Sequence, residues 1–122
     1  MKICIQNVTP LNSDTLTNAM IESCKKVASP GTEIVYKNTK QGVLRTYFIG
    51  FGYTRLLNAR EIIESMLEAR REGCDAIIND CTLDAGFSEA QEVLDIPVIR
   101  VTDACLKYAT LLGAEVWSCH IA

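Results

Sequence analysis

The cysteine at position 81 is the side chain whose type and placement most favour chemistry. It lies in the run I-N-D-C-T-L-D-A-G-F, directly after an apolar segment with the pattern of a buried strand and just ahead of a predicted helix. Backbone N–H groups and a helix N-terminus at such a junction stabilise a thiolate, and they also bind a carboxylate or similar anion. Thr82 adds a hydroxyl donor. The alternative is that Cys81 is a small buried apolar side chain, as free cysteines often are, and placement alone leaves both interpretations open.

The remaining cysteines are weaker candidates by position: Cys4, Cys24, Cys74, Cys105 and Cys119. One lies inside a predicted strand, and two lie at apolar positions of predicted helices, which favours packing in the core. Cys74 precedes a strand, at the end of a parallel sheet where ligands do not bind. Cys119 stays ambiguous, and the single histidine, His120, is interpreted as a terminal polar residue.

The segments that must position Cys81 alternate between strand and helix patterns. Short apolar runs predict strands over residues 2–6, 33–37, 75–80, 96–101 and 115–120. Helical spacing of apolar residues predicts helices over 14–28, 54–72, 89–94 and about 102–112. We expect Ser13 or Asp14 to cap the first helix, Ser88 the third, and Thr102 or Asp103 the fourth.

Strands separated by helices predict an α/β fold, in which a mainly parallel sheet of four or five strands is covered on both faces by helices. We expect a three-layer, flavodoxin-like sandwich formed by residues 1–122 as a single domain. Ligands of such sheets bind beyond the carboxyl ends of the strands. This rule selects one pair of residues after each of the first four strands: Asn7 and Thr9, Asn38 and Thr39, Cys81 and Thr82, and Thr102 and Asp103.

The segment 38–52 is rich in glycine and aromatic residues. The aromatic side chains in it and beside it are Tyr47, Phe48, Phe51 and Tyr53. Such a segment is typical of a mobile loop near a ligand or of a loop that packs against a partner subunit.

Composition and charge exclude several classes. Twelve Lys and Arg against fifteen Asp and Glu give a net charge of −3, which argues against nucleic-acid binding. No apolar stretch approaches the roughly 20 residues that span a bilayer, and the start is too short for a signal peptide, so we expect a cytoplasmic protein without a membrane partner. In that compartment the six cysteines are expected to be reduced. No C-x-x-C pair exists and there is one histidine, so no metal site is expected.

Residues at specific positions exclude several families of α/β proteins. A response-regulator receiver needs acidic residues after the first strand, where Gln6 and Asn7 stand. The phosphate-binding and dinucleotide-binding glycine motifs are missing, and T-P-L-N-S-D-T is only a weak match to a flavodoxin phosphate loop. A low-molecular-weight phosphatase needs an arginine six residues after its nucleophilic cysteine, and that position holds Phe87.

The stretch from Val27 to Gly113 resembles the amino-terminal lobe of the aspartate/glutamate/hydantoin racemases, and its order and spacing are similar to the hydantoin and allantoin racemase branch. The resemblance rests on four runs, of which C-T-L-D-A-G is the most specific piece: V-A-S-P-G-T-E-I, A-R-R-E-G-C-D-A-I-I-N-D-C-T-L-D-A-G-F, A-Q-E-V-L-D-I-P-V-I-R-V-T-D-A-C and Y-A-T-L-L-G.

The resemblance implies a racemase that uses no cofactor such as pyridoxal phosphate and acts on an amino acid or a hydantoin-like compound. Family members have two similar lobes, and each lobe supplies one cysteine, so that one thiolate removes the α-proton and the other thiol returns a proton to the opposite face. Inversion at carbon needs a base on one face and an acid on the other. Cys81 matches the first-lobe cysteine, and Thr82 matches the neighbour that helps to hold a carboxylate or ring carbonyl.

Asn7 and Thr9 match the family's polar loop after the first strand, and Thr102 joins them as a candidate substrate-binding residue from its strand end. The first loop departs from the usual N-P-N-T run, since it reads Q-N-V-T-P-L-N here.

The chain corresponds to about half of a typical family member, and no second-lobe cysteine is matched. It is therefore expected to be a truncated form, a half-size relative that pairs as a homodimer and sets two Cys81 side chains across a shared site, or a module that binds a ligand without turning it over. An interaction protein that uses the segment 38–52 is a further hypothesis.

Overall fold

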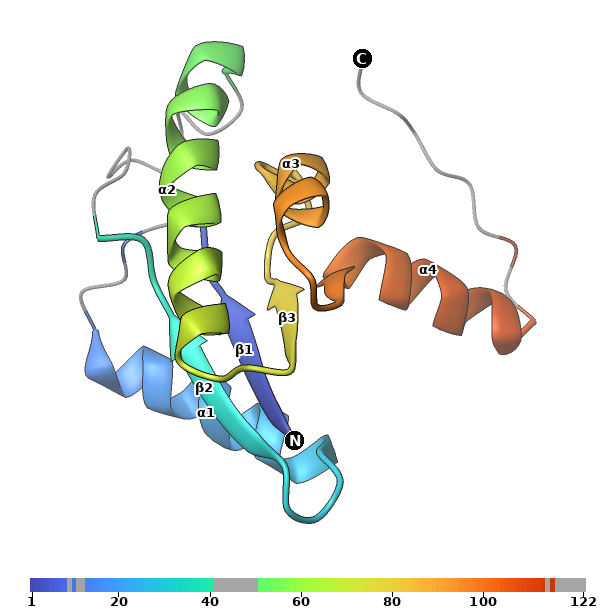
Figure 1. Ribbon diagram of the computed structural model, residues 1–122. Coiled ribbons are helices and arrows are strands. Elements are labelled where there is room, and N and C mark those ends of the chain that lie inside the picture. Colours follow the sequence, from blue (N-terminus) through green and yellow to red (C-terminus); the bar gives the residue numbers. More distant parts are fainter. Residues whose placement is uncertain (9, 11–12, 41–50, 114, 116–122) are drawn as a thin grey trace.

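The computed structural model describes residues 1–8, 10, 13–40, 51–113 and 115 (Figure 1). Several expectations from the sequence fall outside these residues. They concern the strand predicted over 115–120, the candidate Thr9, the aromatic residues Tyr47 and Phe48, and the terminal residues Cys119 and His120.

Four strands form one parallel sheet in the order β2-β1-β3-β4. They are β1 (Lys2–Gln6), β2 (Glu33–Lys37), β3 (Ala76–Asn79) and β4 (Val98–Arg100). This confirms the predicted parallel α/β sheet of flavodoxin-like order. The third and fourth strands are shorter than predicted. β4 ends at Arg100 because the next helix begins at the following residue.

Helices follow each strand: α1 (Asp14–Val27), α2 (Gly52–Arg71), α3 (Phe87–Val93) and α4 (Val101–Leu111). The cap of the first helix is as predicted, since Ser13 Oγ accepts a hydrogen bond of 3.4 Å from the N–H of Leu16. The long second helix begins at Gly52, two residues before the predicted start.

The predicted starts of the last two helices are wrong. α3 begins two residues early, and its N-cap is Gly86 in the left-handed region at φ 73°. Ser88 is therefore inside the helix and does not cap it. α4 uses Arg100 as its N-cap, so Thr102 and Asp103 lie in its first turn instead of ahead of it.

The sheet lies between two layers of helices (Figure 1). α1 packs behind β2, and α2 and α3 cover the other face, where the main core forms. The core is made of buried apolar side chains from α2, α3, three of the strands and the adjoining loops: Cys4, Val8, Ile62, Met66, Ala69, Cys74, Ile77, Ala85, Phe87, Ala90 and Val98. α4 has no buried residue and projects from the rest of the molecule.

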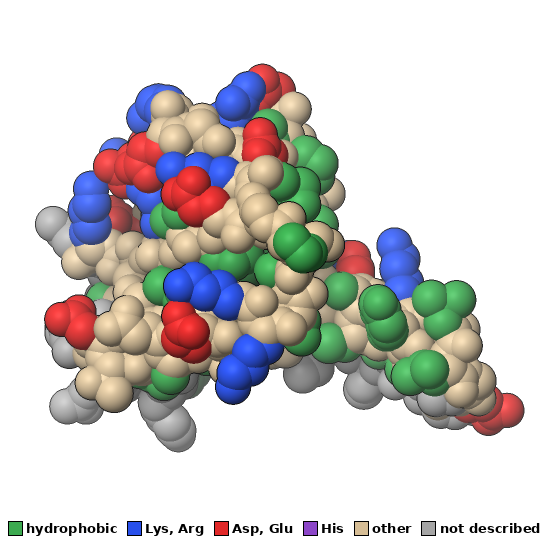
Figure 2. Space-filling view, turned by 90° about the horizontal axis from the view of Figure 1, so that it is seen from below, with side chains coloured by type: hydrophobic (Ala, Val, Ile, Leu, Met, Phe, Trp, Pro, Cys, Tyr) green, Lys and Arg blue, Asp and Glu red, His purple; other side chains and the backbone are tan. Residues whose placement is uncertain are grey.

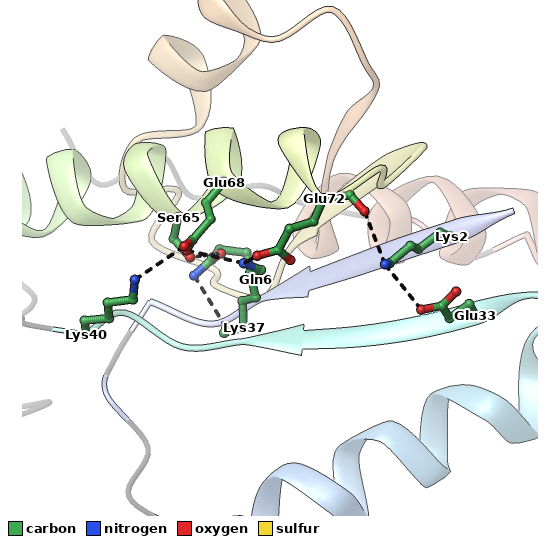
Figure 3. Close-up of polar contacts among 8 residues, drawn as sticks. All are labelled: Lys2, Gln6, Glu33, Lys37, Lys40, Ser65, Glu68 and Glu72. Atoms are coloured by element: carbon green, nitrogen blue, oxygen red, sulfur yellow. Dashed lines mark hydrogen bonds and ion pairs between the residues drawn. The ribbon is translucent and has the colours of Figure 1, made fainter.

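A polar network joins α2 to the sheet (Figure 3). Ser65 Oγ donates to Gln6 Oε1 at 2.7 Å, and Gln6 itself has no exposed surface. Lys37 Nζ lies 3.3 Å from Glu68 of α2 and 2.8 Å from Glu72, the C-cap residue of that helix. These bonds satisfy polar groups that the sheet would otherwise bury unpaired, and they fix α2 over the last residues of β1 and β2.

No described helix is long and apolar enough to cross a membrane. The described residues also include no group of three or more His, Cys, Asp or Glu side chains that could hold a metal ion. Five cysteines are described, and each is a free thiol.

Candidate active site

The carboxyl ends of the four strands are level with one another. Gln6 pairs in register with Lys37 on one side and with Asn79 on the other, and Asn79 pairs with Arg100. The residues that follow these positions therefore lie along one edge of the sheet. Asn7, Cys81 and Thr102 are among them, in the relative placement that the strand-end rule predicts.

Cys81 is half-buried at this edge and packs against the core. Its Sγ accepts a hydrogen bond of 3.3 Å from the backbone N–H of Leu83. Burial raises the pKa of the Cys81 thiol above its ordinary value, and the carboxylates of Asp84 and Asp80 add to the rise, while hydrogen bonding from the backbone of Leu83 and Asp84 opposes it. The expected N–H groups are therefore present at the sulfur, but the cost of burying a thiolate outweighs them.

The carboxylate of Asp80 lies beside Tyr36 of β2, and its charge also acts on Cys24 of α1. The hydroxyl of Tyr36 donates to Asp80 Oδ2 at 3.3 Å. Burial raises the pKa of Tyr36 to about 12, and the charge of Asp80 contributes to this rise. The phenol therefore stays protonated and remains a donor that holds the Asp80 carboxylate in place.

Arg100 joins three segments beside Cys81. Its Nη1 lies 3.2 Å from Asp84 Oδ2, in the loop after the cysteine. Its Nε and Nη2 lie 2.9 Å and 2.7 Å from Asp103 Oδ2, in the first turn of α4. The guanidinium carbon stands 4.6 Å from the centre of the Phe87 ring, at the start of α3. One side chain thus links the loop 82–84 to both following helices.

Asn7 braces the loop that follows β1. Its Nδ2 donates to Asn38 Oδ1 at 3.1 Å, and its Oδ1 accepts from the N–H of Val8 at 2.9 Å. Both ends of this amide are therefore engaged within the chain, and Asn7 is only 8% exposed. The structure thus gives Asn7 a supporting role at the edge.

Comparison with known proteins decides the family. A sequence profile of Asp/Glu/hydantoin racemases matches residues 5–117. The chain belongs to this family. It is 28% identical to a hydantoin racemase of Pseudomonas sp. (strain NS671) over 113 residues, 91% of this chain and 43% of the relative. It is also 28% identical to a hydantoin racemase of Paenarthrobacter aurescens over 115 residues, 93% of this chain and 47% of the relative.

Solved structures of racemases have the same fold. An allantoin racemase from Klebsiella pneumoniae superposes with a TM-score of 0.77 at 26% identity, over 91% of this chain and 43% of that protein. An allantoin racemase from Pseudomonas fluorescens superposes with a TM-score of 0.75 at 28% identity, over 91% and 45%. The chain spans less than half the length of each of these racemases.

Sequence reasoning missed two polar residues at this edge of the sheet. Asn79 and Arg100 both lie within the predicted apolar strands, and Arg100 stands two residues before Thr102, the first of the pair that the strand-end rule selects. A polar residue at the last position of a buried strand is the signal that could have found both.

Unpaired buried polar atoms gather near Cys81. Asn79 has no exposed surface, and neither its Nδ2 nor its Oδ1 has a hydrogen-bond partner among the described residues. Thr102 Oγ1 and Asp84 Oδ1 are also buried, and neither atom has a hydrogen-bond partner among the described residues. Thr82, by contrast, is exposed. Buried polar groups without partners are costly and are found where function or an additional bound group requires them.

Replacing Asn79 with leucine is expected to raise the free energy of unfolding by about 1 kcal/mol, because an apolar side chain of similar shape removes the cost of the unpaired amide. The measurement is urea denaturation followed by circular dichroism. Gln6→Met is the matched control, since Gln6 is equally buried but is bonded to Ser65 and to the carbonyl of Asn7. The control is expected to lose about 1–3 kcal/mol. A loss of stability in Asn79→Leu would show that the amide is paired in solution.

A hollow in the surface lies along α2, between that helix and the segment after β2. It is lined by Lys40, Glu61, Glu64, Ser65, Glu68 and Arg71. None of the candidates that the structure describes, Asn7, Cys81, Thr82 and Thr102, lines this hollow. Cys81 is therefore not part of its lining.

Proposed function

We propose that this protein is a cofactor-independent racemase or epimerase of the hydantoin type, in which Cys81 removes the α-proton of the substrate. The observation that carries the proposal is the position of Cys81 in a chain of the racemase family. It stands at the carboxyl edge of the sheet, with the N–H of Leu83 bonded to its sulfur. A hydantoin, a related cyclic ureide or a free amino acid carries the acidic C–H that this base would attack.

The proposed reaction needs a base, a charge-stabilising environment and an acid. The Cys81 thiolate takes the α-proton, and the electron pair left on carbon moves into the neighbouring carbonyl to give an enolate. The exposed hydroxyl of Thr82, beside the cysteine, is proposed to donate to this oxygen. A proton returned to the same face restores the starting isomer, whereas inversion requires an acid on the opposite face.

We propose that a second copy of the chain supplies that acid, so that two Cys81 thiols share one site. The support is the exposed apolar surface of α4 and its C-cap residue, where Tyr108, Leu111 and Leu112 are 70%, 81% and 83% exposed (Figure 2). Exposed apolar surface of this kind is typical of an interface. Analytical ultracentrifugation of the active protein tests this point, and a strict monomer that inverts substrate at full rate would contradict it.

A ligand-binding module without turnover is the second candidate function. The observation that favours it is the raised pKa of Cys81, caused mainly by burial, which keeps the thiol protonated near neutral pH and leaves little of the thiolate that could act as a base. For either candidate function we propose a cytoplasmic location, because thiols stay reduced in that compartment.

The test is exchange of the substrate α-hydrogen with deuterated water, followed by proton NMR. The panel comprises allantoin, 5-substituted hydantoins and free amino acids, each as a single enantiomer, with polarimetry alongside. Exchange with inversion is the expected result on at least one cyclic ureide. Exchange without inversion would leave Cys81 as a base and contradict the second acid. No exchange on any compound, together with measurable binding, would favour the ligand-binding module.

The exchange rate is expected to rise about tenfold per pH unit between pH 6 and pH 8. The thiolate is the reactive form, and burial raises the pKa of Cys81, so the thiolate is the minor form throughout this range and its fraction grows with pH. Rates are corrected for the uncatalysed exchange of each compound, measured with Cys81→Ala protein. A plateau that begins below pH 7 would contradict a raised pKa for the catalytic base.

A further inference from the structure

We propose that Arg100 is a positioning residue for Cys81, which fixes the loop 82–84 so that its backbone N–H groups face the sulfur. The inference rests on the proposed role of Cys81 as a base. It concerns a residue outside the cysteine motif, 19 positions along the chain and at the end of the neighbouring strand.

The loop needs an external support because of its backbone shape. Asp84 has φ 52°, which makes it the one non-glycine residue in the left-handed region among those described. A side chain at such a position is held there by its surroundings and not by its own preference. The turn brings the N–H of Leu83 to 3.3 Å from Cys81 Sγ, as in the backbone concavities that bind anions.

Two contacts hold Asp84 in this conformation. Its backbone carbonyl accepts from the N–H of Phe87 at 3.1 Å, and its carboxylate pairs with Arg100 at 3.2 Å. Arg100 is fixed in turn by Asp103 and by the face of the Phe87 ring. The guanidinium binds two carboxylates through different nitrogens, and a lysine ammonium has no equivalent planar geometry.

The charge of Arg100 favours the Cys81 thiolate, as does its positioning of the loop. The carboxylates that oppose ionisation of Cys81 are those of Asp84 and Asp80. Tyr36 donates to the second of these, and Arg100 neutralises the first. Loss of the guanidinium would loosen the loop and also leave the Asp84 charge uncompensated, so both effects disfavour the thiolate.

The test is the rate at which iodoacetamide alkylates Cys81 between pH 6 and pH 10, quantified by mass spectrometry on the peptide that carries it. Arg100→Gln is expected to slow alkylation at pH 8 by about fivefold to tenfold, which corresponds to a rise in pKa approaching one unit. Arg100→Lys is expected to recover part of the loss. Arg70→Gln is the matched control, because Arg70 pairs with Asp95 through two nitrogens on the outer side of α2. In Arg70→Gln the alkylation rate of Cys81 is expected to stay within twofold of the wild-type rate.

Cys74 reports global unfolding in the same samples, since it is fully buried and should not react in a folded chain. If Arg100→Gln unfolds, Cys74 becomes labelled, and the comparison is made on Arg100→Lys. The proposal would be overturned if Cys81 were alkylated at the wild-type rate in folded Arg100→Gln or in folded Arg100→Lys.

Asp84→Asn separates positioning from charge. This change removes a negative charge that disfavours the thiolate, but it also removes the ion pair that holds the loop. Slower alkylation supports the positioning role, and faster alkylation overturns it. Alkylation needs no substrate. A protein that exchanges no α-hydrogen at all would contradict the proposed function, and the same protein could still show the Arg100 effect on Cys81.

Discussion

Replacing Cys81 with alanine is expected to lower the rate of substrate α-hydrogen exchange by about a thousandfold, within the range of 10²–10⁴ that a positioned base contributes. The effect should be large because Cys81 is the sulfur at the carboxyl edge that is bonded to the N–H of Leu83. The measurement is proton NMR in deuterated water, on whichever compound of the hydantoin panel the wild-type protein exchanges.

A second cysteine provides the control for this experiment. Cys24 is only partly buried on α1, which packs across the sheet from the main core and is not part of the proposed interface. Cys24→Ala is expected to exchange substrate within twofold of the wild-type rate. Thermal unfolding of both variants should match the wild type closely, because Cys81 is only half-buried. Substantial exchange by folded Cys81→Ala protein would end the case for this thiol as the base.

Replacing Gly86 with alanine is expected to cost about 2–4 kcal/mol of folding free energy, through backbone strain and close packing together. Gly86 has φ 73°, and a Cβ there would lie 3.1 Å from the carbonyl oxygen of Ala59 and 3.3 Å from Ile63 Cγ1. The atom that it meets first belongs to the backbone of α2, which cannot turn aside as a flexible side chain could. The measurement is urea denaturation of the variant and the wild type.

A substitution at Gly73 separates the cost of backbone strain from the cost of close packing. It also has a positive φ, 86°, but a Cβ there would meet nothing within 4 Å. Gly73→Ala should therefore show the backbone strain alone, about 1–2 kcal/mol. Equal losses in the two variants would mean that α3 and α2 separate easily at Gly86, which would contradict the tight contact between them. Because α3 begins one residue later, a displaced helix should also disturb the Phe87–Arg100 contact.

The sheet was predictable because its strands are short apolar runs separated by helices, and such runs are a local property of the sequence. The position of Cys81 followed from the same reading, because parallel strands end at one edge whatever their order in the sheet. The starts of α3 and α4 were not predictable in this way. Gly86 takes the N-cap position through a left-handed backbone, and the strand–helix junction at Arg100 has no capping side chain.

The N–H group at the Cys81 sulfur is local and was expected, but the wider surroundings of Cys81 were not predictable, because they depend on contacts between distant segments. The ion pair of Arg100 with Asp84 joins residues 16 positions apart, and nothing in either local sequence identifies the other. Asn79 reads as an ordinary strand end, and its lack of a partner becomes visible only when its neighbours are placed. The burial that raises the pKa of Cys81 is likewise a property of the assembled core.

The strand order β2-β1-β3-β4 has a consequence for the direction from which a ligand enters. The chain leaves β1 toward β2 on one side, and after α2 it returns past β1 to form β3 on the other side. The loops after β1 and β3 therefore diverge, and a topological switch point lies between them. Open parallel sheets bind ligands at such points. In the described sheet, β1 and β3 are the only neighbouring strands whose loops diverge in this way. Asn7 follows β1 and Cys81 follows β3, so a substrate is expected to enter between these two residues.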